Sequence, residues 1–266
     1  MWQKGRLGKQ VTAARQSNLA IIALYLIFIA GAELTTNYDK RYGIAFHACI
    51  LFALLIHSAV IITANRAFSE LLSTLVVAPL IRILSISMPL IRFNFVTWFV
   101  LISIPVFITL FTLTYLQGIK PHDIALNPPK LKYLPLEIAA ILFAIPFGIV
   151  EYHILKPGIL VPFGFRTLIV PALILILCTG FMEELAFRGL MQYHAVRTLG
   201  FSGIVFVSVL FGFLHIGNLS AMDVLLASSV GFIYSLIVEV TGSIYGISIS
   251  HGIINITLFL IAPFYF

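Results

Sequence analysis

Residues 167–190 read TLIVPALILILCTGFMEELAFRGL, and this stretch decides both the class of fold and where to look for a site. It is long and apolar enough for a helix that crosses a bilayer, which takes about 20 residues. Near its end it carries Glu183, Glu184 and Arg188. Charged groups are costly in hydrocarbon, and those that persist there usually face a wet cavity and take part in chemistry. The stretch therefore predicts a membrane helix that carries functional charges.

The composition of the whole chain gives the same picture. Of its 266 residues, 61% are hydrophobic and 10% are charged, whereas soluble domains are about 25% charged. The net charge of +6 comes largely from residues before the first apolar run and in loops, and no Lys or Arg follows Arg197. This distribution orients a membrane protein and argues against a nucleic-acid partner. The two cysteines, Cys49 and Cys178, lie in separate apolar runs and predict neither a disulfide framework nor a metal site.

Apolar runs predict an all-α fold, a polytopic membrane bundle of about 8–9 transmembrane helices. The runs cover residues 19–35, 44–65, 71–91, 95–116, 134–154, 167–190, 202–218, 221–240 and 245–263. The clearest break between two of these runs is residues 117–133, which contain prolines and lysines. We take this segment as a loop that separates a variable N-terminal bundle, residues 1–116, from a catalytic domain, residues 134–266.

The run at residues 71–91 is the weakest candidate for a span, because it contains Pro79 and Arg82. A re-entrant or interfacial segment is the alternative. If it crosses and the N-terminus is cytoplasmic, the loop with Lys120, Lys130 and Lys132 also faces the cytoplasm, as the positive-inside rule prefers. We therefore expect nine spans rather than eight, with a cytoplasmic N-terminus.

The glutamate pair divides into two roles by its position on the helix. Glu184 and Arg188 are four residues apart, so they share a helical face in the order that favours an ion pair. Glu183 is turned by about 100° from Glu184 and has no such neighbour. An unpaired carboxylate in an apolar site holds its proton more tightly, which suits a general base.

Two further polar patterns follow on the next apolar runs. The first is Phe211-x-x-x-His215, and the second is His251-x-x-x-Asn255, whose spacing places imidazole and amide on one helical face. The Asn255 amide could stabilise an oxyanion. Taken singly, each pattern also fits a buried hydrogen-bonding group.

The three patterns together, in this order, resemble the CAAX protease and bacteriocin-processing family (CPBP, or Abi), which includes the type II CAAX prenyl endopeptidases. The approach to the last motif, GFIYSLIVEVTGSI at residues 231–244, is similar to that family as well. The resemblance covers about residues 134–262. It implies an intramembrane endopeptidase in which Glu183 activates water, His215 and His251 line the site, and Asn255 stabilises the oxyanion.

The resemblance also implies supporting roles and leaves the cofactor open. Glu184 and Arg188 would hold the geometry of the site. If a divalent metal such as zinc is bound, Glu183, His215 and His251 would be its ligands. The expected partners are the lipid bilayer and a membrane protein or peptide substrate, and the small size and type of family favour a prokaryotic cell membrane.

Other classes of function compete with this hypothesis. A proton-coupled transporter would use Glu183 and the histidines as a relay, and a non-catalytic immunity or scaffold protein of the same fold would not need Glu183. Residues 200–203, GFSG, together with His251 resemble the pair of rhomboid serine proteases, with Ser202 as nucleophile. That alternative leaves Glu183 and His215 without a role.

Overall fold

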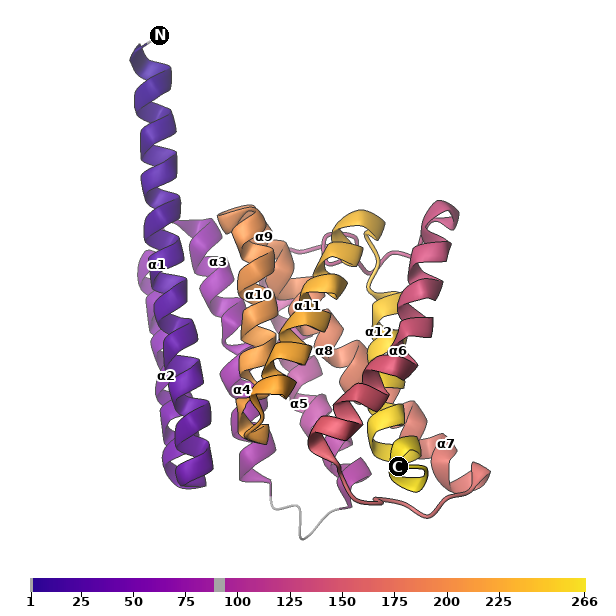
Figure 1. Cartoon of the computed structure of the whole chain (residues 1–266). Helices are drawn as coiled ribbons and strands as arrows, with labels where there is room; N and C mark the ends of the chain where they lie inside the picture. Colours follow the sequence, from indigo (N-terminus) through magenta and orange to yellow (C-terminus); the bar gives the residue numbers. More distant parts are fainter. Residues whose placement is uncertain (1, 89–93) are drawn as a thin grey trace.

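The protein is a bundle of helices, described by a computed structural model for residues 2–88 and 94–266, with side chains for residues 15–88, 94 and 96–266 (Figure 1). The N-terminal half contains α1 (Trp2–Tyr38), α2 (Lys40–Ile61), α3 (Arg66–Leu75), α4 (Val77–Ser87) and α5 (Phe95–Leu116). Next come η1 (Leu131–Tyr133), α6 (Leu134–Leu155), α7 (Phe165–Ile174), η2 (Leu175–Phe181), α8 (Met182–Glu184), η3 (Leu185–Met191) and α9 (Gln192–Leu199). The chain ends with α10 (Phe201–Phe213), η4 (Ile216–Asn218), α11 (Ala221–Thr241), α12 (Tyr245–Ile256), η5 (Thr257–Ile261) and η6 (Ala262–Phe264).

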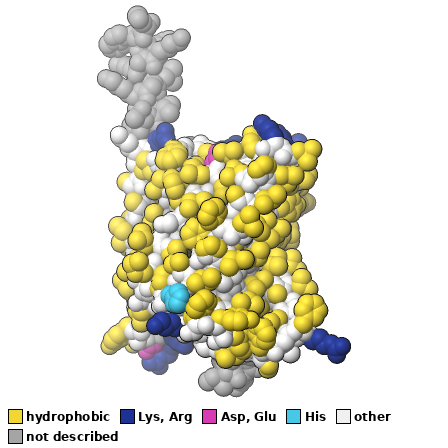
Figure 2. Space-filling view, turned by 45° about the vertical axis from the view of Figure 1, so that its right-hand side comes forward, with side chains coloured by type: hydrophobic (Ala, Val, Ile, Leu, Met, Phe, Trp, Pro, Cys, Tyr) yellow, Lys and Arg dark blue, Asp and Glu magenta, His cyan; other side chains and the backbone are white. Residues whose placement is uncertain are grey.

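The outer surface of the bundle suits lipid. Nine helical stretches within the described residues are long and apolar enough to cross a membrane. Hydrophobic side chains cover the face seen in Figure 2, and lysines and arginines gather at its two ends. Large apolar side chains such as Ile27, Phe52 and Leu142 are more than half exposed, as expected where the solvent is hydrocarbon. The predicted all-α, polytopic membrane fold is confirmed.

The third predicted span is formed by α3 and α4, which meet at Val76 and together run from Arg66 to Ser87. The predicted run of residues 71–91 starts five residues too late, and its last residues, 89–91, lie outside the described part of the chain. In its most apolar window 56% of residues are buried inside the protein. The segment therefore packs as an internal element of the bundle.

The helix that carries the glutamates is longer than residues 167–190. It runs without a break from Phe165 to Leu199, over 35 residues. Hydropathy falls after residue 190 because α9 contains polar side chains, but Gln192 and His194 in α9 are buried against protein. The predicted end at residue 190 was wrong, because hydropathy identifies the parts of a helix that face lipid. Helix α9 faces protein instead.

Helix η2, which precedes the glutamates, lies against α12 at two glycines. A Cβ atom on Gly180 would lie 2.4 Å from the Ser248 carbonyl oxygen, and one on Gly252 would lie 2.7 Å from the Ile176 Cα atom. Small residues allow this close backbone approach between membrane helices. Both η2 and η3, which flank the glutamate pair, are wound as π-helix, a form found mostly at functional sites. The packing brings the first and last sequence motifs together.

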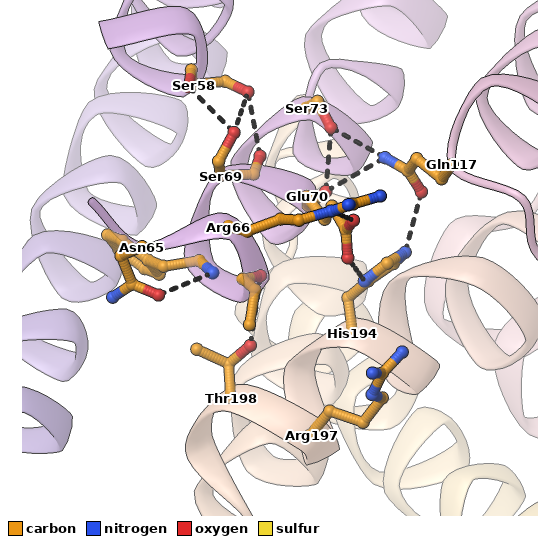
Figure 3. A network of polar contacts seen from close by, with 12 residues as sticks. Ser58, Asn65, Arg66, Ser69, Glu70, Ser73, Gln117, His194, Arg197 and Thr198 are labelled. Atoms are coloured by element: carbon orange, nitrogen blue, oxygen red, sulfur yellow. Dashed lines mark hydrogen bonds and ion pairs between the residues drawn. The ribbon is translucent and has the colours of Figure 1, made fainter. Parts of the chain in front are cut away.

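A polar network joins the two halves of the chain at one end of the bundle (Figure 3). The Gln117 amide donates to the Ser73 hydroxyl over 2.8 Å, and its oxygen lies 2.8 Å from the His194 Nε2 atom. The His194 Nδ1 atom lies 3.9 Å from the Glu70 carboxylate. Helices α3 and α5 are thereby tied to α9, and one hydrophobic core extends through both halves.

Candidate active site

The glutamate pair occupies α8, deep in the bundle. Glu184 is fully buried, and Arg188 donates to its Oε1 atom over 3.1 Å, so the predicted ion pair is present. The guanidinium group of Arg188 also lies over the Phe211 ring at 4.2 Å. Glu183 points elsewhere, and its side chain is 25% exposed. The Glu184 carboxylate is thus enclosed by protein, whereas the Glu183 side chain is partly exposed.

His251, on α12, lies between these two carboxylates. Its Nδ1 atom is 2.8 Å from the Glu184 Oε1 atom, and its Nε2 atom is 3.8 Å from the Glu183 Oε2 atom. Because a carboxylate can only accept, the Nδ1 atom donates to Glu184. The Nε2 atom is then left to face Glu183.

His215 follows the end of α10 and has an acidic partner that the sequence patterns did not reveal. Its Nδ1 atom is 3.0 Å from the Oδ2 atom of Asp223, in the first turn of α11. The Asn218 amide donates to the same oxygen over 2.8 Å. The Phe211 ring contacts both imidazoles, with its centroid 5.4 Å from His215 and 5.8 Å from His251. Each imidazole is therefore held by a carboxylate through Nδ1, and both contact the same aromatic ring.

Asn255 is the fourth predicted residue. Its amide nitrogen donates to the Thr179 hydroxyl over 2.9 Å, and the hydroxyl in turn donates to the Leu175 carbonyl oxygen. The amide carries two N–H donors, so this contact leaves one for another acceptor. Thr179 belongs to η2, so the contact also crosses the glycine interface between η2 and α12.

One cavity of about 450 Å³ brings these side chains together. Its lining contains the four predicted residues Glu183, His215, His251 and Asn255, together with Trp98, Phe99, Glu151, Leu155, Pro157, Thr179, Asn218, Leu258 and Phe259. One lining residue, Leu155, is the last residue of α6, and this helix ends toward the end of the bundle opposite the N-terminus (Figure 1). None of the described residues that line the cavity is a lysine or arginine.

The depths of the site residues agree once the longer helix is taken into account. If the helix ended at residue 190, as predicted from hydropathy, His215 would lie roughly 10 Å deeper than Glu183. With the helix extending to Leu199, Glu183 lies about 24 Å along the axis from that end. His215 lies about 21 Å beyond Phe201, the first residue of α10. The two side chains are therefore at similar depth.

Glu151 and Asp223 are the site residues that sequence reasoning missed. Glu151 in α6 is 8% exposed and lines the cavity, whereas His153, two residues further along the helix, is exposed. Asp223 is fully buried. The available signal was an acidic residue within an apolar run, but no local spacing linked either residue to His215.

A metal would find donors of suitable chemistry in the cavity. The ligands expected from the family resemblance are Glu183, His215 and His251, and imidazole with carboxylate is a set that zinc accepts. Within the described residues, the group with donor atoms all within 4.8 Å of one another is a different one: Glu151, His215 and Asp223. His215 is common to both sets.

Other polar residues of the sequence motifs have local roles. Ser202 lies in the first turn of α10, and nine residues of helix, about 13 Å, separate it from Phe211, which contacts His251. The structure therefore places the serine of the rhomboid-like pattern, Ser202, away from the cavity.

Glu239 also has a local role, because it accepts a hydrogen bond from the Gln192 amide over 3.0 Å.

Comparison with known proteins gives a match to one family model. Residues 164–257 match the family described as "Type II CAAX prenyl endopeptidase Rce1-like". This segment contains Glu183, His215, His251 and Asn255, and lacks α1–α6. No curated protein and no solved structure matches the chain significantly. The resemblance predicted from the motifs is confirmed: over residues 164–257 the chain is similar to the Rce1-like type II CAAX prenyl endopeptidases.

Proposed function

We propose that the protein is an intramembrane endopeptidase that cleaves a membrane protein or peptide with water activated by Glu183. The observation that carries this proposal is the common cavity of Glu183, His215, His251 and Asn255. Four residues from three separate sequence motifs line the same space, and each motif lies within the segment that matches the endopeptidase family.

In the proposed mechanism Glu183 acts as the general base. A water molecule between Glu183 and the scissile bond gives a proton to the carboxylate while its oxygen attacks the carbonyl carbon. The free N–H of Asn255 donates to the oxyanion that forms. The tetrahedral intermediate then collapses, the carbon–nitrogen bond breaks, and the leaving amine takes up a proton.

The histidines serve this chemistry with fixed orientations. Glu184 holds the Nδ1 atom of His251, so its Nε2 atom interacts with Glu183 and the water. Asp223 holds His215 in the same way, which leaves the His215 Nε2 atom as a proton donor to the leaving amine. A carboxylate behind an imidazole selects the tautomer and stabilises its protonated form. Asp223 is therefore a positioning residue in this mechanism.

A divalent ion would add Lewis-acid chemistry by polarising the scissile carbonyl. The family resemblance assigns Glu183, His215 and His251 as the residues that would hold it. The roles of Glu183 as base and of His215 as proton donor apply to the site without that ion, because a nitrogen that binds a metal carries no proton.

The walls of the cavity favour a substrate with an apolar part. Trp98 and Phe99 come from α5, and Leu258 and Phe259 come from η5. These four side chains contribute apolar surface to a cavity whose lining also includes carboxylates and imidazoles. We propose that an apolar side chain or lipid-like group of the substrate binds there while the polypeptide backbone reaches Glu183.

We also propose that the N-terminus faces the cytoplasm of a prokaryotic cell. The loop that carries Lys120, Lys130 and Lys132 connects α5 to α6 at the end of the bundle near the N-terminus (Figure 1). The positive charge of this loop supports the orientation. Reporter enzymes fused after Leu116 and after residue 160 should report opposite sides of the membrane.

The test is proteolysis by the purified full chain in liposomes. Wild type and Glu183→Gln are incubated with a library of membrane-inserted peptides, prenylated and unprenylated, and the products are identified by mass spectrometry. Cleavage by wild type and none by the folded variant is the expected result. Equal cleavage by both proteins would overturn the role of Glu183, and an inward proton current without any cleavage would favour the transporter.

A further inference from the structure

Three acidic or imidazole side chains from separate elements converge beside the proposed catalytic water. Glu151 comes from the last turns of α6, His215 from the turn after α10, and Asp223 from the first turn of α11. Each offers a donor atom within 4.8 Å of the other two. Zinc bonds to nitrogen and oxygen are about 2.0–2.2 Å long. Two ligands of one ion are thus at most about 4.4 Å apart, so small side-chain movements would complete the group.

Asp223 has more acceptor capacity than its neighbours use. Its Oδ2 atom accepts from Asn218 and lies 3.0 Å from the His215 Nδ1 atom. Its Oδ1 atom is buried and has no hydrogen-bond partner among the described residues. A buried carboxylate oxygen without a partner costs free energy, unless a proton or a cation satisfies it.

The charge of the cavity is also unbalanced. Glu151 and Glu183 line it, Asp223 adjoins it, and among the described residues no lysine or arginine belongs to its lining. Two arginines near it in the described part of the chain are already engaged. Arg188 is paired with Glu184, and Arg82, which faces an adjoining hollow, donates to both oxygens of Glu33. A bound cation would balance the carboxylates.

We propose that Glu151, His215 and Asp223 form a binding site for a divalent transition-metal ion such as Zn²⁺. One imidazole with two carboxylates suits zinc and its neighbours better than calcium, which prefers six to eight oxygen ligands. This ligand set differs from the one that the family resemblance implies, because it uses one histidine instead of two and omits Glu183. The binding of the ion does not depend on the proposed proteolysis.

The site would connect the catalytic residues to the rest of the bundle. His215 would be bound by the ion and by the α11 carboxylate, so in the metal-bound protein it would not give a proton to the leaving amine. Glu151 would tie both to α6. The turn between α10 and α11, which contains η4, would thereby be fixed against the cavity wall. The positive charge would lie beside Glu183, where it favours the ionised carboxylate that a general base needs.

Metal binding by the full-length protein tests the proposal directly. The purified protein in detergent is stripped with a chelator, exchanged into metal-free buffer and titrated with Zn²⁺ against a fluorescent zinc indicator. One tightly bound ion is expected for wild type. Glu151→Gln and Asp223→Asn should each weaken zinc binding at least tenfold. Glu183→Gln, which removes a neighbouring charge but no ligand, should weaken zinc binding by much less than tenfold. The control Glu239→Gln, a carboxylate outside the cavity, should keep wild-type affinity.

X-ray absorption of the zinc-loaded protein counts the imidazole ligands. One histidine supports the proposed set, whereas two histidines, with loss of binding in Glu183→Gln, would overturn it in favour of the other set. No stoichiometric binding to wild type would overturn both. If Asp223→Asn does not fold, the zinc affinity of Glu151→Gln decides the test. Among the described residues, no hydrogen bond from a turn to the Glu151 side chain is lost in that variant. Proteolysis is measured separately, so failure of one proposal leaves the other standing.

Discussion

Each half of the protein contains a buried cluster of glutamate, arginine and histidine. In the C-terminal half Glu184 binds Arg188 over 3.1 Å and His251 over 2.8 Å. In the N-terminal half Glu33 binds Arg82 over 2.6 Å and lies 3.3 Å from His47. Both glutamates are fully buried. The two clusters are chemically alike, so composition alone does not distinguish a candidate active site from a packing element.

The surroundings of the histidine make the difference. The His47 side chain is completely buried, and its cluster contains one carboxylate. The His251 side chain is 11% exposed, its second nitrogen faces Glu183, and both border the cavity. A second carboxylate and access for water and substrate are what turn such a cluster into a candidate site.

The largest expected effect separates the two clusters by chemistry. Glu183→Gln should lower the turnover number about 100- to 10,000-fold, because the amide cannot accept a proton. The melting temperature should stay near that of wild type. Glu33→Gln should do the opposite, lowering the melting temperature while turnover per folded molecule stays close to wild type. Both quantities are measured on the same purified samples. Substantial turnover by Glu183→Gln would remove the distinction.

The arginines should differ in their contribution to stability. Arg188→Ala leaves Glu184 buried without its partner and should cost about 3–5 kcal/mol. Arg188→Lys should recover little, since an ammonium group cannot replace the guanidinium packed over Phe211. The Arg82 side chain is 19% exposed, so Arg82→Ala should cost less, about 2 kcal/mol.

Unfolding in graded denaturant, together with turnover at saturating substrate, checks this order. An Arg188→Ala protein that is fully stable but inactive would assign Arg188 a direct catalytic or binding role. Equal losses for the two arginines would show that solvent access does not distinguish the clusters.

Close helix packing should matter at the glycine contact between η2 and α12 and not at Gly31 of α1. Gly180→Ala forces η2 away from α12 and should cost about 1–3 kcal/mol, with a fall in turnover because Glu183 and Asn255 move apart. Gly31→Ala in α1 meets only the Phe46 ring at 3.5 Å, so it should be neutral or stabilise the helix by up to about 1 kcal/mol. Thermal unfolding of the pair tests this, and similar behaviour of both variants would refute it.

The smallest expected effect concerns the rhomboid-like pattern. Ser202→Ala should change stability by no more than about 0.5 kcal/mol and leave turnover unchanged. A serine-directed fluorophosphonate probe should label wild type and variant equally weakly. Strong labelling of wild type that disappears in Ser202→Ala would restore the serine protease alternative.

Local spacing was enough to predict the parts of the site that lie on single helices. The pairing of Glu184 with Arg188 follows from their separation by four residues, and it is present. The helical bundle with nine apolar segments follows from hydropathy. Both depend on the residues of one segment and on the surrounding lipid, which is why they can be derived without a structure.

Contacts across the bundle could not be predicted in this way. Glu151 and Asp223 meet His215 from two other helices, and Glu33, His47 and Arg82 come from three. No periodicity links such residues. The end of the glutamate helix at Leu199 was missed for a related reason, because α9 is covered by protein rather than lipid. The catalytic roles of Glu183, His215, His251 and Asn255 remain predictions.

The glycine contact between η2 and α12 has a consequence for how such a protein can diversify. The relative position of the glutamate motif and the asparagine motif is fixed by close backbone contacts at Gly180 and Gly252. Part of the cavity wall, in contrast, is supplied by α5 through Trp98 and Phe99, outside the segment that matches the family. Mutations that reshape this wall need not disturb those backbone contacts. Substrate preference and bond-breaking chemistry can therefore evolve as separate traits within one chain.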